Sequence, residues 1–354
     1  MDNGASTGDG APRGARHTLI FRYKEGGLPM SNPATAATAA TPGNPAAPTP
    51  RPDLGPFRYH DAFSRNIGWV TEAEQEQLRH STVSIGGLGG VGGTHAITLA
   101  RLGVGGFRIS DLDHFDWPNM NRQAGAFAST VGRDKLDAVA ETLADINPEA
   151  RLHLIPGGIH DHNIDEFLQG AHLYMDSLDI FALNLRRKVF ARCRELGIPA
   201  VTAAPMGMGT AFLAFDPEGM SFEDYFDFEG GLSAEAERDP QQRFREQIVK
   251  FICGVSPAMI QRHYLLNRET VNLFERKVPS TCIGIELAAG VACANGIKLM
   301  LKRGETRVAP RGLHFDAFRN QMVKTWRPGG GRHPMSRLMF KYVRGLLLPK
   351  KPKA

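Results

Sequence analysis

The chain has 354 residues, of which 42% are hydrophobic and 22% are charged, enough for one large α/β domain or two smaller ones. It has no run of about 18 apolar residues, and its first residues do not show a charged start followed by an apolar core, so we expect neither a membrane span nor a secretory signal. The four cysteines form no C-x-x-C pair, which argues against a four-cysteine zinc site and favours reduced thiols in a cytoplasmic protein.

The net charge of +5 is concentrated near one end of the chain. Residues 324–354 contain nine Lys or Arg and no Asp or Glu, so the remainder carries a net negative charge. We therefore expect 311–354 to form a basic tail, either solvated or in contact with nucleic acid, acidic partners or anionic lipid. We expect 1–56 to be disordered, because 31–50 contain no charge and no large apolar residue.

Between 57 and 310, strand patterns alternate with helix patterns. A capping box, T-E-A-E at 71–74, opens a short helix that ends before Ser81. The alternation predicts a Rossmann-like α/β fold, with a doubly wound, mostly parallel sheet and an extra C-terminal strand and helix region. The expected strands are 82–85, 107–111, 151–155, 173–175, 199–204 and 210–215. The expected helices are 91–102, 134–146, 163–168, 181–196 and 281–302.

Two further segments have a distinctive composition. The helix expected at 281–302 is rich in Ala and Gly on all sides, so we expect it to be buried against the sheet or a second subunit. Residues 220–280 are less regular and include a charged linker at 233–245.

A glycine-rich turn, G-L-G-G-V-G, follows the first strand and opens the next helix. Its glycines let the backbone turn sharply and bring N–H groups close to a phosphate, and the helix N-terminus adds partial positive charge. Asp111 lies 19 residues beyond the last glycine, a spacing common for a carboxylate that accepts ribose hydroxyls. This pattern fits NAD, FAD or ATP equally. The glycines are Gly87, Gly89, Gly90 and Gly92.

Polar and cationic residues after the second strand favour a triphosphate. Asn119, Arg122 and Lys135 supply an amide, a guanidinium fork and an ammonium, which suit a ligand with several negative charges. Asp179 follows the strand at 173–175, where a carboxylate faces the ligand crevice and can hold Mg²⁺ together with phosphate oxygens. Hydride transfer requires no such cluster.

With these motifs in place, residues 57–215 and the helix expected at 281–302 resemble the ThiF/MoeB family of adenylating domains related to ubiquitin-activating enzymes. The shared set comprises G-L-G-G-V-G, D-x-D, N-x-N-R-Q, G-x-x-K, I-N-P and the strand-end Asp179. The resemblance implies Mg-ATP binding and adenylation of a carboxylate, often the C-terminal glycine of a ubiquitin-like protein. It assigns the ribose to Asp111, the phosphates to Asn119, Arg122 and Lys135, and Mg²⁺ to Asp179.

The segment F-S-R-N at 63–66 resembles the Y-x-R-Q of this family, whose Arg reaches the phosphates of the neighbouring subunit. Arg65 would take that role, which implies a homodimer. Phe63 and Asn66 depart from the family's Tyr and Gln, its C-x-x-C pairs are missing, and no cysteine follows Ala204 closely. N-x-N-R-Q also resembles tRNA threonylcarbamoyladenosine dehydratases, whose tRNA substrate would suit a basic tail.

Several other residues allow two interpretations. Asp113 and Asp116 fit loop carboxylates better than catalysts, and His95 fits a packed side chain better than a catalytic one. H-D-H at 160–162 suggests a metal site, but Asn163 suggests a helix cap there instead. Cys282 lies near a helix N-terminus, which can activate a thiol, although a buried cysteine is usually inert. The acidic and aromatic stretch 222–229 suits a partner surface, a lid or core packing.

Three functions remain open from the sequence. The first is an ATP-dependent adenylyltransferase that activates the carboxylate of a ubiquitin-like protein, a tRNA, a peptide or a small metabolite. The second is an NAD- or FAD-binding oxidoreductase, which accounts for the glycines and Asp111 but not for Arg122, Lys135 and Asp179. The third is a non-catalytic nucleotide-binding scaffold that recruits a partner.

Overall fold

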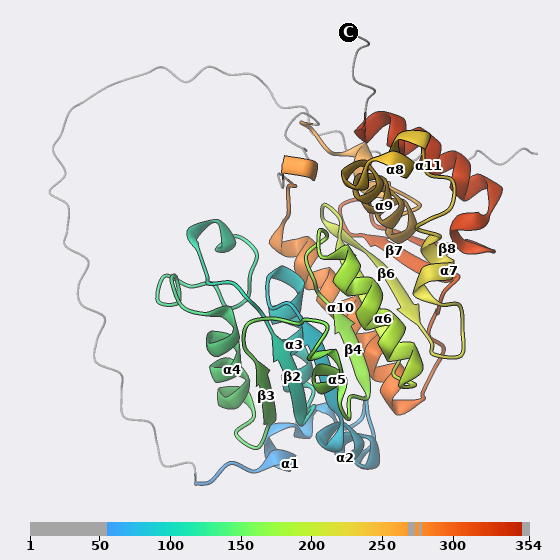
Figure 1. Ribbon diagram of the computed structural model, residues 1–354. Helices are drawn as coiled ribbons and strands as arrows, with labels where there is room; N and C mark the ends of the chain where they lie inside the picture. Colours follow the sequence, from blue (N-terminus) through green and yellow to red (C-terminus); the bar gives the residue numbers. More distant parts are fainter. Residues whose placement is uncertain (1–54, 268–272, 276–277, 349–354) are drawn as a thin grey trace, which may run out of the picture. The chain divides into compact units, whose positions relative to one another are not determined.

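An eight-stranded sheet in the order β3-β2-β1-β4-β5-β6-β7-β8 organises the fold (Figure 1). The computed structural model describes residues 55–267, 273–275 and 278–348. The five strands from β3 to β5 are parallel, and β6, β7 and β8 extend the sheet antiparallel. The strands are β1 (Thr82–Gly86), β2 (Gly106–Ser110), β3 (Arg151–Ile155), β4 (Leu173–Asp176), β5 (Ala200–Pro205), β6 (Gly209–Phe215), β7 (Arg311–Asp316) and β8 (Gln321–Trp326).

Helices cover both faces of the sheet. One face packs against α3, α4 and α10, and the other against α5, α6, α7 and α9, with a separate apolar core on each side. The helices are α1 (Tyr59–Ala62), α2 (Glu72–His80), α3 (Gly90–Arg101), α4 (Lys135–Ile146), α5 (Ile164–Leu168), α6 (Leu183–Glu195), α7 (Phe222–Phe226), α8 (Ala234–Arg238), α9 (Pro240–Val255), α10 (Cys282–Leu301) and α11 (Pro334–Leu347). Short 3₁₀ turns are η1 (Ser64–Asn66), η2 (Trp117–Asn119), η3 (Ile260–His263), η4 (Leu273–Glu275) and η5 (Gly330–Arg332).

The expected doubly wound α/β fold is confirmed. The chain builds β1, β2 and β3 in one direction and then returns to add β4 on the other side of β1. This reversal creates a crevice outside the carboxyl ends of β1 and β4, which is where open α/β sheets bind ligands. The capping box at Thr71 and Glu74 is also present, with each side chain bonded to the other residue's backbone N–H.

The expected basic tail is corrected for residues 311–348. These residues form β7 and β8, which continue the main sheet, and α11, which packs on α9. Most of the cations lie at exposed positions between apolar residues that face the core, although Arg327 is buried, and their number concealed this pattern. Residues 349–354 and 1–54, where we expected the end of the tail and a disordered segment, lie outside the described residues.

The expected charged linker at 233–245 is also corrected. It forms α8 and the first turns of α9, capped by the side chains of Ser233 and Asp239. The buried Glu246 on α9 accepts hydrogen bonds from the backbone and hydroxyl of Ser233 and pairs with Arg344 on α11. Charged residues here connect α8, α9 and α11 through hydrogen bonds and an ion pair, so this segment is not a solvated linker.

Helix α10 lies on β4, β5 and β6 and beside α3. Its small residues permit this close approach, since a side-chain carbon on Gly296 would lie 2.7 Å from Leu173. The expectation that this helix is buried against the sheet is therefore confirmed. Among the described residues it is the one helix long and apolar enough to cross a membrane by length and composition, properties that a core helix shares.

Candidate nucleotide site

The glycine turn lies at the carboxyl end of β1, at the switch point of the sheet. Gly87 has φ +88°, and a side-chain carbon there would lie 2.5 Å from the carbonyl oxygen of Ser177. The same carbon on Gly92 would lie 1.8 Å from the carbonyl oxygen of Gly87. Only glycine fits at both positions. The turn consequently brings the N-terminus of α3 to the crevice, with backbone N–H groups available to an anion.

Asp111 follows β2 and lies directly beside this turn. Its Oδ2 accepts a hydrogen bond from the backbone N of Leu88 at 2.5 Å, and its Oδ1 accepts one from the backbone N of Asp113 at 2.8 Å. The carboxylate thus fastens the glycine turn to the end of the neighbouring strand. Each oxygen retains acceptor capacity, which suits the ribose role implied by the resemblance.

Lys135, the first residue of α4, is brought back to the end of β2 by the intervening loop. Its backbone N donates to the carbonyl of Asp113 at 3.0 Å, and its Nζ lies 3.1 Å from Asp113 Oδ2. The Lys135 side chain is 6% exposed and that of Asp113 is 72% exposed. Asp113 is therefore a loop carboxylate, as expected, but it also holds the nearly buried ammonium. The sequence did not suggest this pairing.

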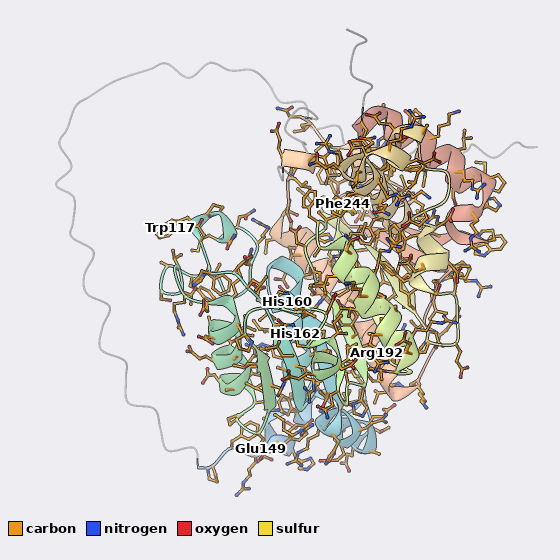
Figure 2. All side chains as sticks on the ribbon, viewed as in Figure 1. Trp117, Glu149, His160, His162, Arg192 and Phe244 are labelled. Atoms are coloured by element: carbon orange, nitrogen blue, oxygen red, sulfur yellow. The ribbon has the colours of Figure 1, made fainter. Side chains whose placement is uncertain are left out.

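The loop after β2 carries the remaining polar residues, with Trp117 exposed near its tip (Figure 2). Asn119 Oδ1 accepts from the backbone N of Asp116 at 3.1 Å. Arg122 donates from Nη1 to the carbonyl of Pro118 at 2.8 Å and to Oδ1 of Asn121 at 2.9 Å. One guanidinium nitrogen, Nη1, is therefore occupied within its own loop.

Gln123, which we had not singled out as a site residue, is buried near Gly89. Its Oε1 has no hydrogen-bond partner among the described residues. An unpaired buried amide oxygen is costly, so a ligand group that donates to it would stabilise this position. The signal available in the sequence was its place in N-x-N-R-Q.

Two aspartates at the carboxyl end of β4, Asp176 as its last residue and Asp179 in the loop that follows, differ sharply in their surroundings. Asp176 is 2% exposed, and its Oδ2 accepts from Nε of the buried Arg186 at 2.8 Å. Asp179 is exposed at the crevice end of the strand, where its Oδ1 caps the backbone N of Phe181 at 2.8 Å. Asp176 therefore serves the fold, whereas Asp179 presents its carboxylate to solvent.

Arg65 lies apart from these residues. It belongs to η1, next to α1 and α2 at the amino end of the parallel strands, where the Tyr59 hydroxyl donates to the carbonyl of Gly103 at 2.6 Å. In Figure 2, Glu149 marks this amino end and Trp117 the opposite one. One chain therefore brings Asp111, Lys135 and Asp179 to the crevice end of the sheet but not its own Arg65.

The histidines are not arranged as a metal site in the described part of the chain. The rings of His160 and His162 stack at 5.6 Å, and no group of three or more potential ligands forms there. Asn163 does not cap α5 with its side chain as expected; its Oδ1 accepts from the backbone of His160 instead. His95 is packed, as expected: burial lowers its pKa to about 3, and its Nδ1 lies 3.1 Å from the Ser177 hydroxyl.

The cysteines are free, and three of them are buried. Burial raises the pKa of the Cys253 thiol to about 12 and raises that of Cys193 and Cys293 as well. Cys282 is exposed at the start of α10, whose N-cap Thr281 bonds to the carbonyl of Gly207. The aromatic rings of 222–229 pack in the apolar core on the sheet face covered by α5, α6, α7 and α9, so core packing is the correct interpretation of that stretch.

A family comparison accounts for this combination of glycine turn, strand-end carboxylates and loop cations. The model of the ThiF family matches residues 63–337. The chain belongs to the ThiF family. Its curated relatives include the tRNA threonylcarbamoyladenosine dehydratase of Bacillus subtilis. The two are 34% identical over 142 residues, which cover 40% of this chain and 55% of that protein. The molybdopterin-synthase adenylyltransferase of Salmonella typhimurium is 29% identical over 134 residues, covering 38% and 53%.

Solved structures share the ThiF-type fold at lower identity. Escherichia coli MccB with ATP superposes with a TM-score of 0.56 at 18% identity, covering 77% of this chain and 73% of that one. PaaA superposes with a TM-score of 0.54 at 14% identity, covering 75% and 73%. The chain spans about half the length of the curated relatives that it matches.

Proposed function

We propose that this ThiF-family protein binds Mg-ATP and adenylates a carboxylate. One carboxylate oxygen of the substrate would form a bond to the α-phosphorus, while the bond from that phosphorus to the bridging oxygen breaks and pyrophosphate leaves with the electron pair. Relatives that support this class of reaction are named as adenylyltransferases of molybdopterin synthase and of the sulfur carrier protein ThiS. The chain would supply positioning and charge, which provide most of the catalysis in such transfers.

The observation that supports the proposal is the nearly buried Lys135, which Asp113 and Asp111 connect to the glycine turn. Its ammonium points at Asp113, whose carboxylate is exposed and can give way to phosphate oxygens. Asp111 would hold the ribose, and Asn119 and Arg122 would hold the outer phosphates once the loop contacts of Arg122 are exchanged for phosphate. An oxidoreductase would leave Lys135 and Asp179 without a role.

Asp179 fits a Mg²⁺ ligand of the kind that nucleotide enzymes use. Mg²⁺ in such sites keeps several waters and takes one or two carboxylates together with phosphate oxygens. Asp179 is exposed at the strand end, and only its Oδ1 has a hydrogen bond among the described contacts, so Oδ2 is available. The metal would neutralise phosphate charge there.

A homodimer completes the proposed site. Arg65 lies at the opposite end of the sheet from the crevice, so it would act on the nucleotide of a partner subunit. The acceptor would be a ubiquitin-like protein, a tRNA, a peptide or a small metabolite with a free carboxylate. Curated relatives are named for a tRNA and for a sulfur carrier protein, and a solved MccB structure for an N-formylated MccA. We expect the reaction to take place in the cytoplasm.

A thermal-shift comparison tests the proposal directly. The melting temperatures of wild type and Asp179→Ala are measured with Mg-ATP, with NAD⁺ and without ligand. Asp145→Ala, on the exposed side of α4, is the matched control. A ligand at 100 times its Kd stabilises the native state by about 2.7 kcal/mol. We expect a Mg-ATP shift in wild type and Asp145→Ala that Asp179→Ala loses. A shift with NAD⁺ alone would favour an oxidoreductase instead.

Turnover separates an enzyme from a scaffold. Exchange of labelled pyrophosphate into ATP, measured with candidate carboxylates, should depend on the acceptor and disappear in Asp179→Ala. Nucleotide binding without exchange across acceptors of all four classes would indicate a non-catalytic nucleotide-binding protein.

A further inference from the structure

Helix α11 has a second apolar face that points away from the protein. Met335, Leu338, Tyr342 and Leu346 follow each other at intervals of three and four residues, so they line one stripe of the helix. They are 66%, 61%, 58% and 54% exposed. We call these four residues the outer stripe. Single exposed apolar residues are ordinary, but four in one row on one helix mark an interaction surface.

The outer stripe is not needed to hold α11 in place. A different face of the helix, with Phe340 and Val343, packs against Val249 and Cys253 of α9. The Lys250 ammonium and the Arg344 guanidinium also lie over the Phe340 ring, 5.1 Å and 5.5 Å from its centre. The helix is therefore anchored on one side and apolar on another. Figure 1 shows α11 beyond α9, far from the loop after β2 and from α4.

Cations border the outer stripe. Arg337 is more than half exposed, with its nearest carboxylate oxygen, on Asp227, 3.9 Å away, and Lys341 is exposed with no ion pair among the described contacts. In the sequence, Lys350, Lys351 and Lys353 follow shortly after the helix, and 324–354 contain no acidic residue. A helix with apolar residues on one side, Lys and Arg beside them and a basic extension matches the pattern of interfacial helices that bind anionic lipid.

Other occupants match this surface less well. A second copy of the chain would bring the same cations together, which disfavours self-association. Nucleic acid is held mainly by cations and by stacking on aromatic rings, and it would leave Met335, Leu338 and Leu346 in water. A bilayer satisfies both features, because its headgroups meet the cations and its acyl chains meet the apolar side chains. The family match ends at residue 337, so most of the stripe lies beyond it.

We propose that α11 docks this protein on an anionic membrane surface through its outer stripe. The helix lies in the plane of the interface, with the stripe immersed roughly 5–10 Å at the boundary between headgroups and acyl chains. This is peripheral attachment that needs no membrane-spanning helix. It does not depend on the proposed adenylation.

The test is flotation of the full chain with vesicles. One set contains phosphatidylglycerol and phosphatidylcholine in equal amounts, and the other contains phosphatidylcholine alone. We expect the wild type to float with the anionic vesicles and to be released by high salt. Leu338→Glu should weaken this binding by about tenfold or more, while Leu196→Glu, at an exposed leucine after α6, should leave it unchanged.

Four further measurements distinguish the membrane from other occupants of the outer stripe and from effects on the nucleotide site. If Leu338→Glu lowers the melting temperature while Leu196→Glu does not, another part of this chain covers the stripe and the proposal is wrong. Dimerisation that Leu338→Glu abolishes would identify a second copy as the occupant. Binding of tRNA that requires Lys341 but not Leu338, without vesicle binding, would identify nucleic acid. If Leu338→Glu loses vesicle binding but keeps the Mg-ATP thermal shift, the loss belongs to α11 and not to the nucleotide site.

Discussion

Lys135 and Asp113 form an ion pair beyond the carboxyl end of β2, with the ammonium nearly buried and the carboxylate mostly in solvent. Such a pair holds the lysine side chain in position before nucleotide arrives and leaves the carboxylate free to move. Asp113→Asn should therefore lower the free energy of unfolding by about 1 kcal/mol, since a buried charge loses an exposed partner. The same variant should show a larger Mg-ATP thermal shift than wild type, because phosphate then becomes the first full counterion of Lys135. An unchanged shift with a normal melting temperature would mean that the pair does not position Lys135.

Gly92 should be indispensable for the glycine turn, whereas Gly290 on α10 should not. A side-chain carbon on Gly92 would clash with the Gly87 carbonyl, but one on Gly290 meets nothing within 4 Å. Gly92→Ala should abolish the Mg-ATP shift. Gly290→Ala should keep it and raise the free energy of unfolding by about 0.5–1 kcal/mol, the usual gain from alanine inside a helix. Thermal melts of both variants with and without Mg-ATP decide this.

Substitution of Asp176, the last residue of β4, should affect stability, whereas substitution of Asp179, just beyond it, should affect activity. Asp176→Asn leaves the buried Arg186 guanidinium without its carboxylate and should cost about 3–5 kcal/mol in denaturant unfolding. Asp179→Asn changes an exposed group and should cost at most about 0.5 kcal/mol while removing pyrophosphate exchange. The proposed metal role would be contradicted if Asp179→Asn retained exchange activity.

Acid should destabilise the protein through His95. Burial holds the pKa of this histidine at about 3, whereas in the unfolded chain it is about 6.5. Below pH 6.5 the unfolded state binds a proton that the native state does not, so the free energy of unfolding falls by about 1.4 kcal/mol per pH unit. Burial lowers the pKa of His314 too, which acts in the same direction.

Denaturant unfolding at pH 7 and pH 5 isolates the His95 contribution. In His95→Asn, the difference between the two pH values should shrink by about 2 kcal/mol relative to wild type, with His314 unchanged in both proteins. Equal differences would mean that His95 is protonated in the native state.

Arg65 should act across a dimer interface. Arg65→Ala and Asp179→Ala should each abolish pyrophosphate exchange. An equimolar mixture of the two variants, left until the subunits have redistributed, should recover about a quarter of wild-type activity. Half of its dimers contain one subunit of each variant, and each such dimer has one complete site of two. Arg58→Ala, on the same segment, is the control. No recovery in a mixture shown to contain mixed dimers would place Arg65 in the site of its own chain or outside catalysis.

The strands β1 to β6 and the glycine turn between β1 and α3 were predictable because both depend on local patterns. The nucleotide roles of Asp111, Asn119, Arg122, Lys135 and Asp179 stay predictions. Alternating strand and helix periods located β1 to β6, and the G-L-G-G-V-G turn has no room for side chains at Gly87 and Gly92. The pairing of Lys135 with Asp113 was not predictable, because it depends on how the loop between 113 and 135 folds back. The last two strands and α11 were missed because nine cations suggested a tail, although R-G-L-H-F-D at 311–316 alternates as a strand does.

β6 cannot pair with β7 until long after β6 itself has been synthesised, because β7 comes late in the chain. All seven residues of β6 are buried, and one edge of this strand is completed by β7, which begins only at Arg311. The roughly hundred residues between them take about 5 to 20 seconds to synthesise. Throughout that time a nascent chain would present a long apolar strand with open hydrogen-bonding groups. The protein should therefore depend on chaperones that shield this strand on the ribosome, and ribosome stalling between β6 and β7 should yield chains that aggregate.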